Sequence, residues 1–296
     1  MTIDHWRCPL CKKKVSTLAD LPNYLYCPTC QLAWIKHFKK PTYDDTYYKG
    51  VSSIASKLFS PIAAILYRLR TGFAPATHIR LWIDVGAGDG EFLKHVHADR
   101  KLGVEISDSA RYIMEESGIE TMTERTFLSS YPLAADVISF WHVLEHLENP
   151  QVYLKAARKH LVRGGTLIIG VPNIDSLEFQ IFRNHWFHLV PNFHLWHYSP
   201  RSLERFLIKY GFIIRAVDYW SIEHHLTGVL QSFINKSAGS DAVLHRFIKR
   251  GHSHIFHPSD VFWSIFWLTI GAPVVILFWL LGALTHKSGT FVAIAQ

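Results

Sequence analysis

The sequence has few cysteines and no run of like charge, and each scarcity excludes a class of protein. Only four cysteines occur among 296 residues, all before residue 31. The first seven residues are polar and no apolar stretch follows them, so we expect a reducing compartment, in which cysteines bind metal more often than they form disulfides. The net charge is +7, but Lys and Arg are spread along the chain, which disfavours a dedicated nucleic-acid-binding arm.

The four cysteines form two pairs with metal-site spacing. Cys8 and Cys11 are separated by two residues, and after fifteen more residues Cys27 and Cys30 repeat the pattern. Each pair can direct two thiolates at one ion, and two pairs close a tetrahedral Zn²⁺ site with no open position. We therefore expect a structural zinc ribbon over residues 1–40, whose small core makes it depend on the metal. Free or disulfide-bonded cysteines are the alternative.

Residues 41–76 are expected to link this ribbon to a larger domain. Within them, Ala55–Arg70 has apolar side chains on one face and is predicted to be a helix. This helix either packs over the main domain or lies on a membrane surface.

A glycine-rich turn follows the first apolar run of the main domain, Leu81–Val85. The turn reads Gly86-Ala87-Gly88-Asp89-Gly90, and a helix is expected to start at Glu91–His97. Glycines let a backbone approach a ligand closely, and a helix N-terminus offers free N–H groups. The sequence lacks the third-glycine spacing of dinucleotide sites, because Gly90 comes one residue early.

Together with the preceding Asp84, this turn resembles the first motif of class I S-adenosylmethionine-dependent methyltransferases. The resemblance implies an α/β fold with a Rossmann-like, seven-stranded sheet and S-adenosylmethionine as cofactor. The residues that it assigns to cofactor binding here are Asp84, Gly86, Ala87, Gly88 and Gly90.

The next strand, Leu102–Ile106, places an acidic residue where such folds bind ribose. Glu105 lies at its end, twenty-one residues after Asp84, and a carboxylate there can accept hydrogen bonds from both ribose hydroxyls. A third strand is expected near Ile119–Met122, and the loop at 124–126 would then neighbour the adenine. A surface role for Glu105 is the alternative.

A fourth strand, Asp136–Phe140, leads into the most distinctive stretch of the chain, Val143-Leu144-Glu145-His146. It resembles the segment after strand four in quinone-biosynthesis methyltransferases, which implies that Trp141 and His142 lie beside the cofactor. In the ubiquinone O-methyltransferase branch a Glu-x-x-Glu-His set is associated with a divalent cation, and here His142 replaces the first Glu. The interpretations are a metal site at His142, Glu145 and His146, or a pair, Glu145 and His146, that orients the loop over the cofactor.

The segment 174–199 follows a fifth strand, Thr166–Val171, and is long for a connection. It falls at the sheet edge where doubly wound folds bind ligands, so we expect it to cover the acceptor substrate. Its stretch 191–199 resembles bacterial relatives from surface-polysaccharide and lipid gene clusters, except that Asn192 replaces their Arg. His194 is a candidate general base, with His197 and His146 as further catalytic candidates. The alternatives are histidines that only order the cap, or a metal site built on His185, His188, His194 and His197.

The last strand, Gly289–Ala295, is separated from strand six, Phe212–Tyr219, by an unusually apolar insertion at 221–286. Val261–Leu284 carries no charge over 24 residues, which is long enough to cross a membrane. A single crossing would separate the last strand from its sheet, and Gly271-Ala272-Pro273 is a natural break. We therefore expect a re-entrant or monotopic hairpin at the cytoplasmic membrane face, with a single span or a buried helix pair as alternatives.

These features predict a methyltransferase domain at 77–220 plus 287–296. The expected activity is O-methylation of a lipid, quinone-like or lipid-linked sugar acceptor. An rRNA methyltransferase is the alternative enzyme, favoured by the pI of 9.2 but not by the apolar insertion. A non-catalytic membrane scaffold is the third hypothesis, which the intact glycine turn disfavours.

Overall fold

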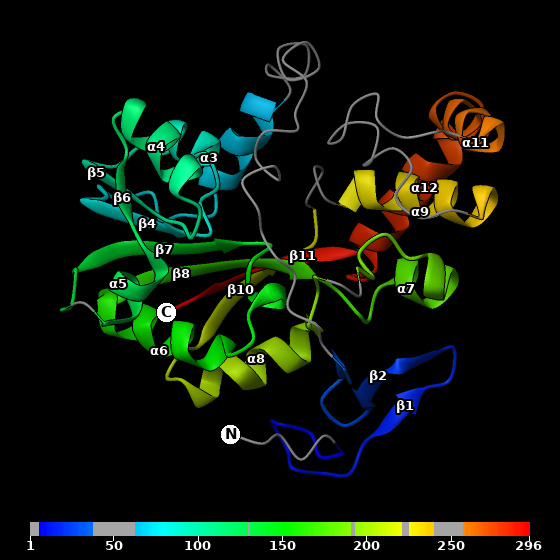
Figure 1. The fold of residues 1–296 in the computed structure, drawn as a ribbon, viewed down its shortest axis with the longest axis horizontal. Coiled ribbons are helices and arrows are strands. Elements are labelled where there is room, and N and C mark those ends of the chain that lie inside the picture. Colours follow the sequence, from blue (N-terminus) through cyan, green and yellow to red (C-terminus); the bar gives the residue numbers. More distant parts are fainter. Residues whose placement is uncertain (1–5, 38–62, 130, 191–192, 221–224, 240–256) are drawn as a thin grey trace.

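The computed structural model describes residues 6–37, 63–129, 131–190, 193–220, 225–239 and 257–296 (Figure 1). Of the helix expected at Ala55–Arg70, the first eight residues lie outside these ranges. Residues 63–71 are helical. Asn192 and the basic residues 246, 249 and 250 that flank the insertion also lie outside the described part.

A seven-stranded sheet forms the centre of the molecule, in the order β10-β11-β8-β7-β4-β5-β6. The strands from β4 to β8 pair in parallel, whereas β11 is antiparallel to both β8 and β10. The central strands are nearly continuous apolar runs because helices cover both of their faces. This arrangement confirms the expected α/β fold, with the last strand of the chain inserted between β8 and β10. The strand bounds are β4 Leu81–Val85, β5 Arg100–Val104, β6 Glu120–Met122, β7 Ala135–Trp141, β8 Leu161–Pro172, β10 Ile214–Asp218 and β11 Thr290–Ala295.

Helices cover the two faces of this sheet unequally (Figure 1). The short α3 (Glu91–Lys94) and α4 (Asp108–Glu116) lie on one face with the helix at 63–71. The other face carries α5 (Glu124–Ser129), α6 (Pro150–His160) and α8 (Pro200–Lys209). Local sequence fixes several helix starts: the Ser107 side chain caps α4, and Ser199 and Ser202 form a capping box on α8.

The N-terminal segment folds as three short strands, β1 (Ser16–Leu18), β2 (Leu21–Cys27) and β3 (Leu32–Ile35). A fourth strand completes this antiparallel sheet, and it comes from far along the chain: β9 (Trp196–His197). The ribbon thus shares a sheet with the segment expected to cover the acceptor.

The apolar insertion folds as α9 (Thr227–Ala238), α11 (Pro258–Leu268) and α12 (Ala272–Leu284). It packs on α7 (Leu177–Phe182), where the Phe182 ring lies 4.8 Å from Phe233 and 5.8 Å from Phe278. In the described part of the chain no single helix has the length and apolar character needed to cross a membrane. Helices α11 and α12 meet those criteria only as a pair, bent by 67° at the expected break around Gly271.

Candidate functional site

The glycine turn after β4 has the backbone conformation that the sequence requires. Gly86 and Gly90 have φ of 75° and 78°, a region that side chains disfavour. Packing also requires them to be glycines, because a Cβ would lie 2.4 Å from Val143 Cγ2 at Gly86 and 2.5 Å from Met114 Cγ at Gly90. The backbone of the turn therefore packs closely against Val143 and Met114. It lies at the carboxyl end of the parallel strands, where doubly wound folds bind their ligands.

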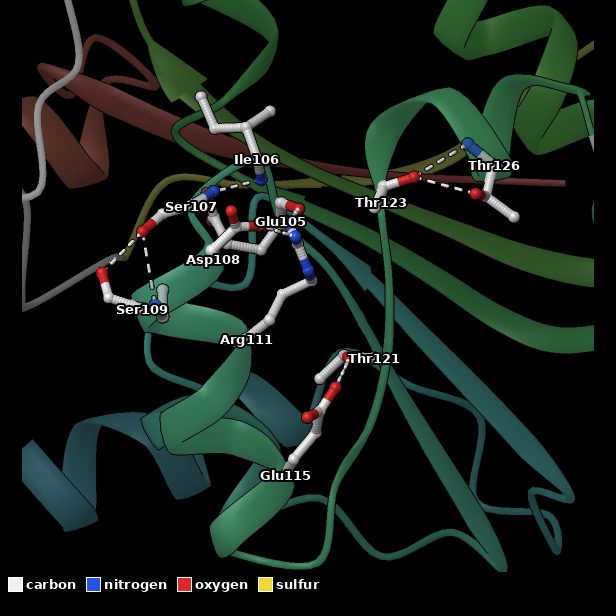
Figure 2. A network of polar contacts seen from close by, with 11 residues as sticks. Glu105, Ile106, Ser107, Asp108, Ser109, Arg111, Glu115, Thr121, Thr123 and Thr126 are labelled. Atoms are coloured by element: carbon white, nitrogen blue, oxygen red, sulfur yellow. Dashed lines mark hydrogen bonds and ion pairs between the residues drawn. The ribbon is translucent and has the colours of Figure 1, made fainter.

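Glu105 directly follows β5 and contacts this turn through Gly88, and Figure 2 shows it beside Ile106 and Ser107. Its buried carboxylate accepts hydrogen bonds from three backbone N–H groups, those of Gly88 (3.0 Å), Ile106 (2.7 Å) and Ser107 (3.1 Å). The Arg111 guanidinium donates to the Glu105 carbonyl oxygen at 2.7 Å. These N–H groups fix the orientation of the carboxylate at the edge of the sheet where doubly wound folds bind ribose.

Asp84 is buried at the end of β4 and accepts a hydrogen bond from Ser139 Oγ at 2.6 Å. Burial raises the pKa of Asp84 to about 7, although Ser139 and the Arg70 charge oppose the shift. A buried carboxyl whose pKa lies near neutral pH is suited to a cationic ligand, because the ligand's positive charge would favour the ionised form.

An open hollow of about 770 Å³ lies between α4 and α5, and its lining begins at Ile106, the residue after Glu105. Ile106 lines it with a side chain that is 51% exposed, and Arg111 and Thr123 also contribute. The region at 124–126, expected beside the adenine, is the start of α5, and its first two residues line the hollow. The sequence analysis missed Ile106 and Arg111, although an apolar side chain directly after the ribose-binding candidate is a signal for adenine packing.

Trp141 and His142 lie at the end of β7 but differ in environment. The Trp141 ring packs between Phe73 and Phe92, at 6.0 and 5.6 Å, and the Arg70 guanidinium lies 5.0 Å from it. His142 has a positive φ of 54° and directs Nδ1 to within 3.3 Å of a Glu145 carboxylate oxygen. His142 therefore reaches the histidine cluster, whereas Trp141 packs toward the helix at 63–71.

Two candidate catalytic histidines meet next to Glu145. The rings of His146 and His194 lie 4.6 Å apart, edge to face. His146 Nδ1 lies 3.0 Å from the Phe193 carbonyl oxygen and His194 Nδ1 lies 2.7 Å from that of His188, so each Nδ1 donates and each Nε2 keeps a lone pair. Burial, together with the neighbouring histidines, lowers the pKa of His194 well below its usual value, so this imidazole is uncharged at neutral pH, with its one proton on Nδ1.

His197 is placed differently. It is fully buried, and its ring packs against Tyr24 at 5.4 Å and Trp186 at 5.6 Å. Burial lowers its pKa to about 3. This environment favours a packing role for His197 and leaves His194 and His146 as the catalytic candidates.

The same residues have the composition of a cation site. Donor atoms of Glu145, His146 and His194 all lie within 4.8 Å of one another, and the buried Glu145 carboxylate accepts no hydrogen bond. Two imidazoles, each with its Nδ1 bonded to a backbone carbonyl, and one carboxylate are a usual ligand set for a divalent metal. His142 is not part of this group. The third donor, which one interpretation of the sequence assigned to His142, is His194. Among the described residues, the His185, His188, His194 and His197 set does not form a cluster of this kind.

The four cysteines converge at the end of the ribbon. Their sulfur atoms lie within 4.8 Å of one another, and all but Cys11 are buried. Four thiols gathered in this way fit a tetrahedral zinc ion held by Cys8, Cys11, Cys27 and Cys30. The Arg205 guanidinium on α8 lies 3.3 Å from Cys30 Sγ, so the cluster also contacts the main domain.

Comparisons with known proteins agree with this arrangement. The chain is similar over 97 residues to an uncharacterized protein of Methanocaldococcus jannaschii, with 33% identity over 32% of this chain and 45% of that protein. It thus matches less than half the length of that relative. Its fold resembles a chain from the complex of the Haloferax volcanii Trm112 methyltransferase activator with a protein assigned as a methyltransferase, with a TM-score of 0.53, 13% identity, and 86% and 98% of the two chains covered. It also resembles the 4+2 cyclase SpnF, with a TM-score of 0.50, 16% identity, and 79% and 81% covered.

At such identities the structural likenesses concern the fold alone, and one of these two proteins is a cyclase. The sequence match is more specific, because the methyltransferase domain family matches residues 54–217, more than half of the chain. That range contains the glycine turn, Glu105 and the histidine cluster. The chain therefore belongs to the methyltransferase domain family.

Proposed function

We propose that this methyltransferase transfers a methyl group to a hydroxyl of a lipid, quinone-like or lipid-linked sugar acceptor at the cytoplasmic face of a membrane. The observation that carries this proposal is the contact between the apolar insertion and His188, whose carbonyl oxygen accepts a hydrogen bond from His194. A Cβ at Gly228 of α9 would lie 2.6 Å from His188 Nε2, so the backbone of the insertion passes directly over that imidazole. The Phe187 N–H also donates to Ser232 Oγ of α9 at 3.0 Å.

The exposed apolar side chains of the insertion favour contact with lipid. Phe262, Ile265 and Leu277 are exposed by 60, 59 and 57% on α11 and α12. Apolar side chains gathered on one surface are typical of membrane or protein contacts. An acceptor with a lipid tail would enter the site from the same side as the membrane.

The position of β11 favours a hairpin over a single crossing. The strand begins six residues after α12 ends and pairs with both β8 and β10 inside the main sheet. Since α9 also packs on that domain through α7, both ends of the α11 and α12 pair belong on the same side of the bilayer. Each helix is about 20 Å long or less at 1.5 Å per residue, short of the hydrocarbon thickness.

In the proposed reaction, bound S-adenosylmethionine supplies an activated methyl group, and the chain supplies alignment and proton removal. Asp84, Glu105 and the glycine turn would hold the cofactor. The neutral Nε2 of His194 would accept the proton of the acceptor hydroxyl, with His146 as the second candidate. His194 is a weak base because of its burial, so the acceptor hydroxyl must lie close to it in a water-excluded site.

Vesicle flotation tests the membrane part of this proposal. A triple variant in which Phe262, Ile265 and Leu277 are all changed to Ser should bind anionic vesicles at least about a hundredfold more weakly. Each apolar side chain buried in the membrane contributes roughly 1.5 kcal/mol or more. The matched control replaces three exposed isoleucines elsewhere, Ile113, Ile208 and Ile213, and should bind like the wild type. Equal binding of both variants would contradict the proposal.

The acceptor is tested with labelled S-adenosylmethionine and cell extracts. Label should enter the organic-solvent-soluble fraction, and His194→Ala should slow this transfer by roughly 10²–10⁴-fold. Label in RNA, with binding that weakens steeply as salt rises, would indicate the rRNA methyltransferase instead.

A further inference from the structure

The ribbon is joined to the acceptor side of the main domain by backbone pairing. Strand β3 pairs with β9 in the register Ala33 to His197 and Trp34 to Trp196. The Ile35 N–H donates to the Leu195 carbonyl oxygen at 3.0 Å. These bonds join residues some 160 positions apart, and β9 begins two residues after His194.

Two further hydrogen bonds join this strand to the loop that carries Glu145 and His146. The Leu195 N–H donates to the Glu145 carbonyl oxygen at 2.7 Å, and Trp196 Nε1 donates to the Leu147 carbonyl oxygen at 2.8 Å. Backbone hydrogen bonds therefore run from β3 through β9 to the loop that carries Glu145 and His146.

Side chains strengthen the same junction. The Tyr24 ring contacts His197 at 5.4 Å, and the Trp34 and Trp196 rings lie 6.3 Å apart. Leu21, Tyr24 and Ala33 of the ribbon belong to one apolar cluster with Ile174, Phe179, Phe182 and Trp186 of the acceptor side. The cysteines lie next to the junction, because Cys27 ends β2 and Cys30 lies two residues before β3.

We infer that the ribbon is a wall of the acceptor site, in which Tyr24 and Trp34 are positioning residues for β9 and hence for His194. Metal binding by the four cysteines then maintains the acceptor site, while the cofactor site at Asp84 and Glu105 stands without it. This inference rests on the proposed role of the histidine cluster in acceptor methylation. It makes the ribbon part of the catalytic domain rather than a separate recruiting module, since its β3 edge is already paired.

Amide hydrogen exchange tests this inference without a known acceptor. The full chain is compared with Tyr24→Ala and with Cys27→Ser, and exchange is followed at the Ile35, Leu195 and Gly86 amides. Loss of the wall should speed exchange at both Ile35 and Leu195 by about tenfold or more, because local opening then releases β9 from Glu145. Gly86, whose N–H donates to the Val104 carbonyl oxygen in the cofactor turn, should stay protected, and the affinity for S-adenosylmethionine should change less than about threefold.

Two matched variants separate positioning from general damage. Tyr24→Phe keeps the ring and removes a hydroxyl that makes no hydrogen bond. This variant should therefore behave like the wild type. Asp20→Asn breaks the ion pair between Asp20 and Arg183, a ribbon contact away from β9, and should leave Leu195 protected.

The outcomes that would overturn the inference are specific. Faster exchange at Ile35 alone would mean that the main domain holds β9 without the ribbon. Simultaneous loss of Gly86 protection and cofactor affinity would mean that the ribbon supports the whole fold. Failure of the wild type to bind S-adenosylmethionine would count against the proposed function instead, and leaves the exchange comparison valid.

Discussion

Cofactor binding should depend on pH through Asp84, because burial holds its pKa at about 7. S-adenosylmethionine carries sulfonium and ammonium cations, so it favours the ionised carboxylate. If only that form binds, affinity falls about tenfold per pH unit below the pKa, and between pH 7.0 and 5.5 the loss is about fifteenfold. Calorimetry in two buffers of different ionisation enthalpy should also detect proton release on binding in this range.

Two substitutions identify the titrating group. Asp84→Asn should bind weakly at every pH and show no slope between pH 5.5 and 7.0. The Ser139 hydroxyl donates to Asp84 and lowers the pKa of that carboxyl. Ser139→Ala should therefore raise the pKa of Asp84, and the loss of affinity on acidification should begin at a higher pH. Wild-type affinity that stays flat over this range, or a slope that survives in Asp84→Asn, would refute the reasoning.

The burial of Asp84 also makes the folding stability depend on pH, and in the opposite direction to the cofactor affinity. The folded, ligand-free protein holds a proton on Asp84 that the unfolded chain has released above about pH 4. Stability of the ligand-free protein should therefore fall as pH rises from about 4 to 7 on account of this residue. Thermal unfolding with and without S-adenosylmethionine should separate the two trends.

Three further predictions concern zinc, ribose and the base. Freshly purified protein should hold about one zinc ion per chain, and Cys8→Ser should lose it; elemental analysis without zinc would contradict the ribbon. Glu105→Ala should lower cofactor affinity roughly ten- to a hundredfold, by 1.5–3 kcal/mol, and unchanged affinity would place the ribose elsewhere. His194→Ala should lower turnover by roughly 10²–10⁴-fold with cofactor affinity intact. If a chelator abolishes turnover of wild-type protein whose ribbon still holds its zinc, and Glu145→Gln also abolishes turnover, the cluster binds a cation and His194 is a ligand.

Local patterns were sufficient to predict the sheet and the turn. The run Leu81–Val85 and the three glycines lie within one strand, turn and helix, and Glu105 directly follows the next strand, so short-range geometry determines them. The break in the insertion was also predictable, because Gly271 and the proline after it interrupt the helix in any context.

Contacts between distant segments could not be predicted in this way. Strand β9 has two residues and no alternating pattern, and its partner β3 lies about 160 positions earlier. The approach of His194 to His146 likewise depends on how the acceptor segment folds back onto the loop after β7. One interpretation of the sequence grouped His142 with Glu145 and His146, whereas the donor atoms that lie close together are those of Glu145, His146 and His194.

The protonation of the histidine cluster favours a neutral acceptor group. Burial lowers the pKa of His194 and His197, so neither carries a positive charge at neutral pH. Both rings also lie close to other imidazoles, and a second charge in a buried cluster is costly. An anionic acceptor group would thus find no counter-charge on these two residues. A hydroxyl, in contrast, needs an unprotonated nitrogen beside it, and His194 Nε2 is held in that state by the bond between Nδ1 and the His188 carbonyl oxygen. The electrostatics of the cluster therefore support O-methylation of an uncharged hydroxyl over methylation of an acid.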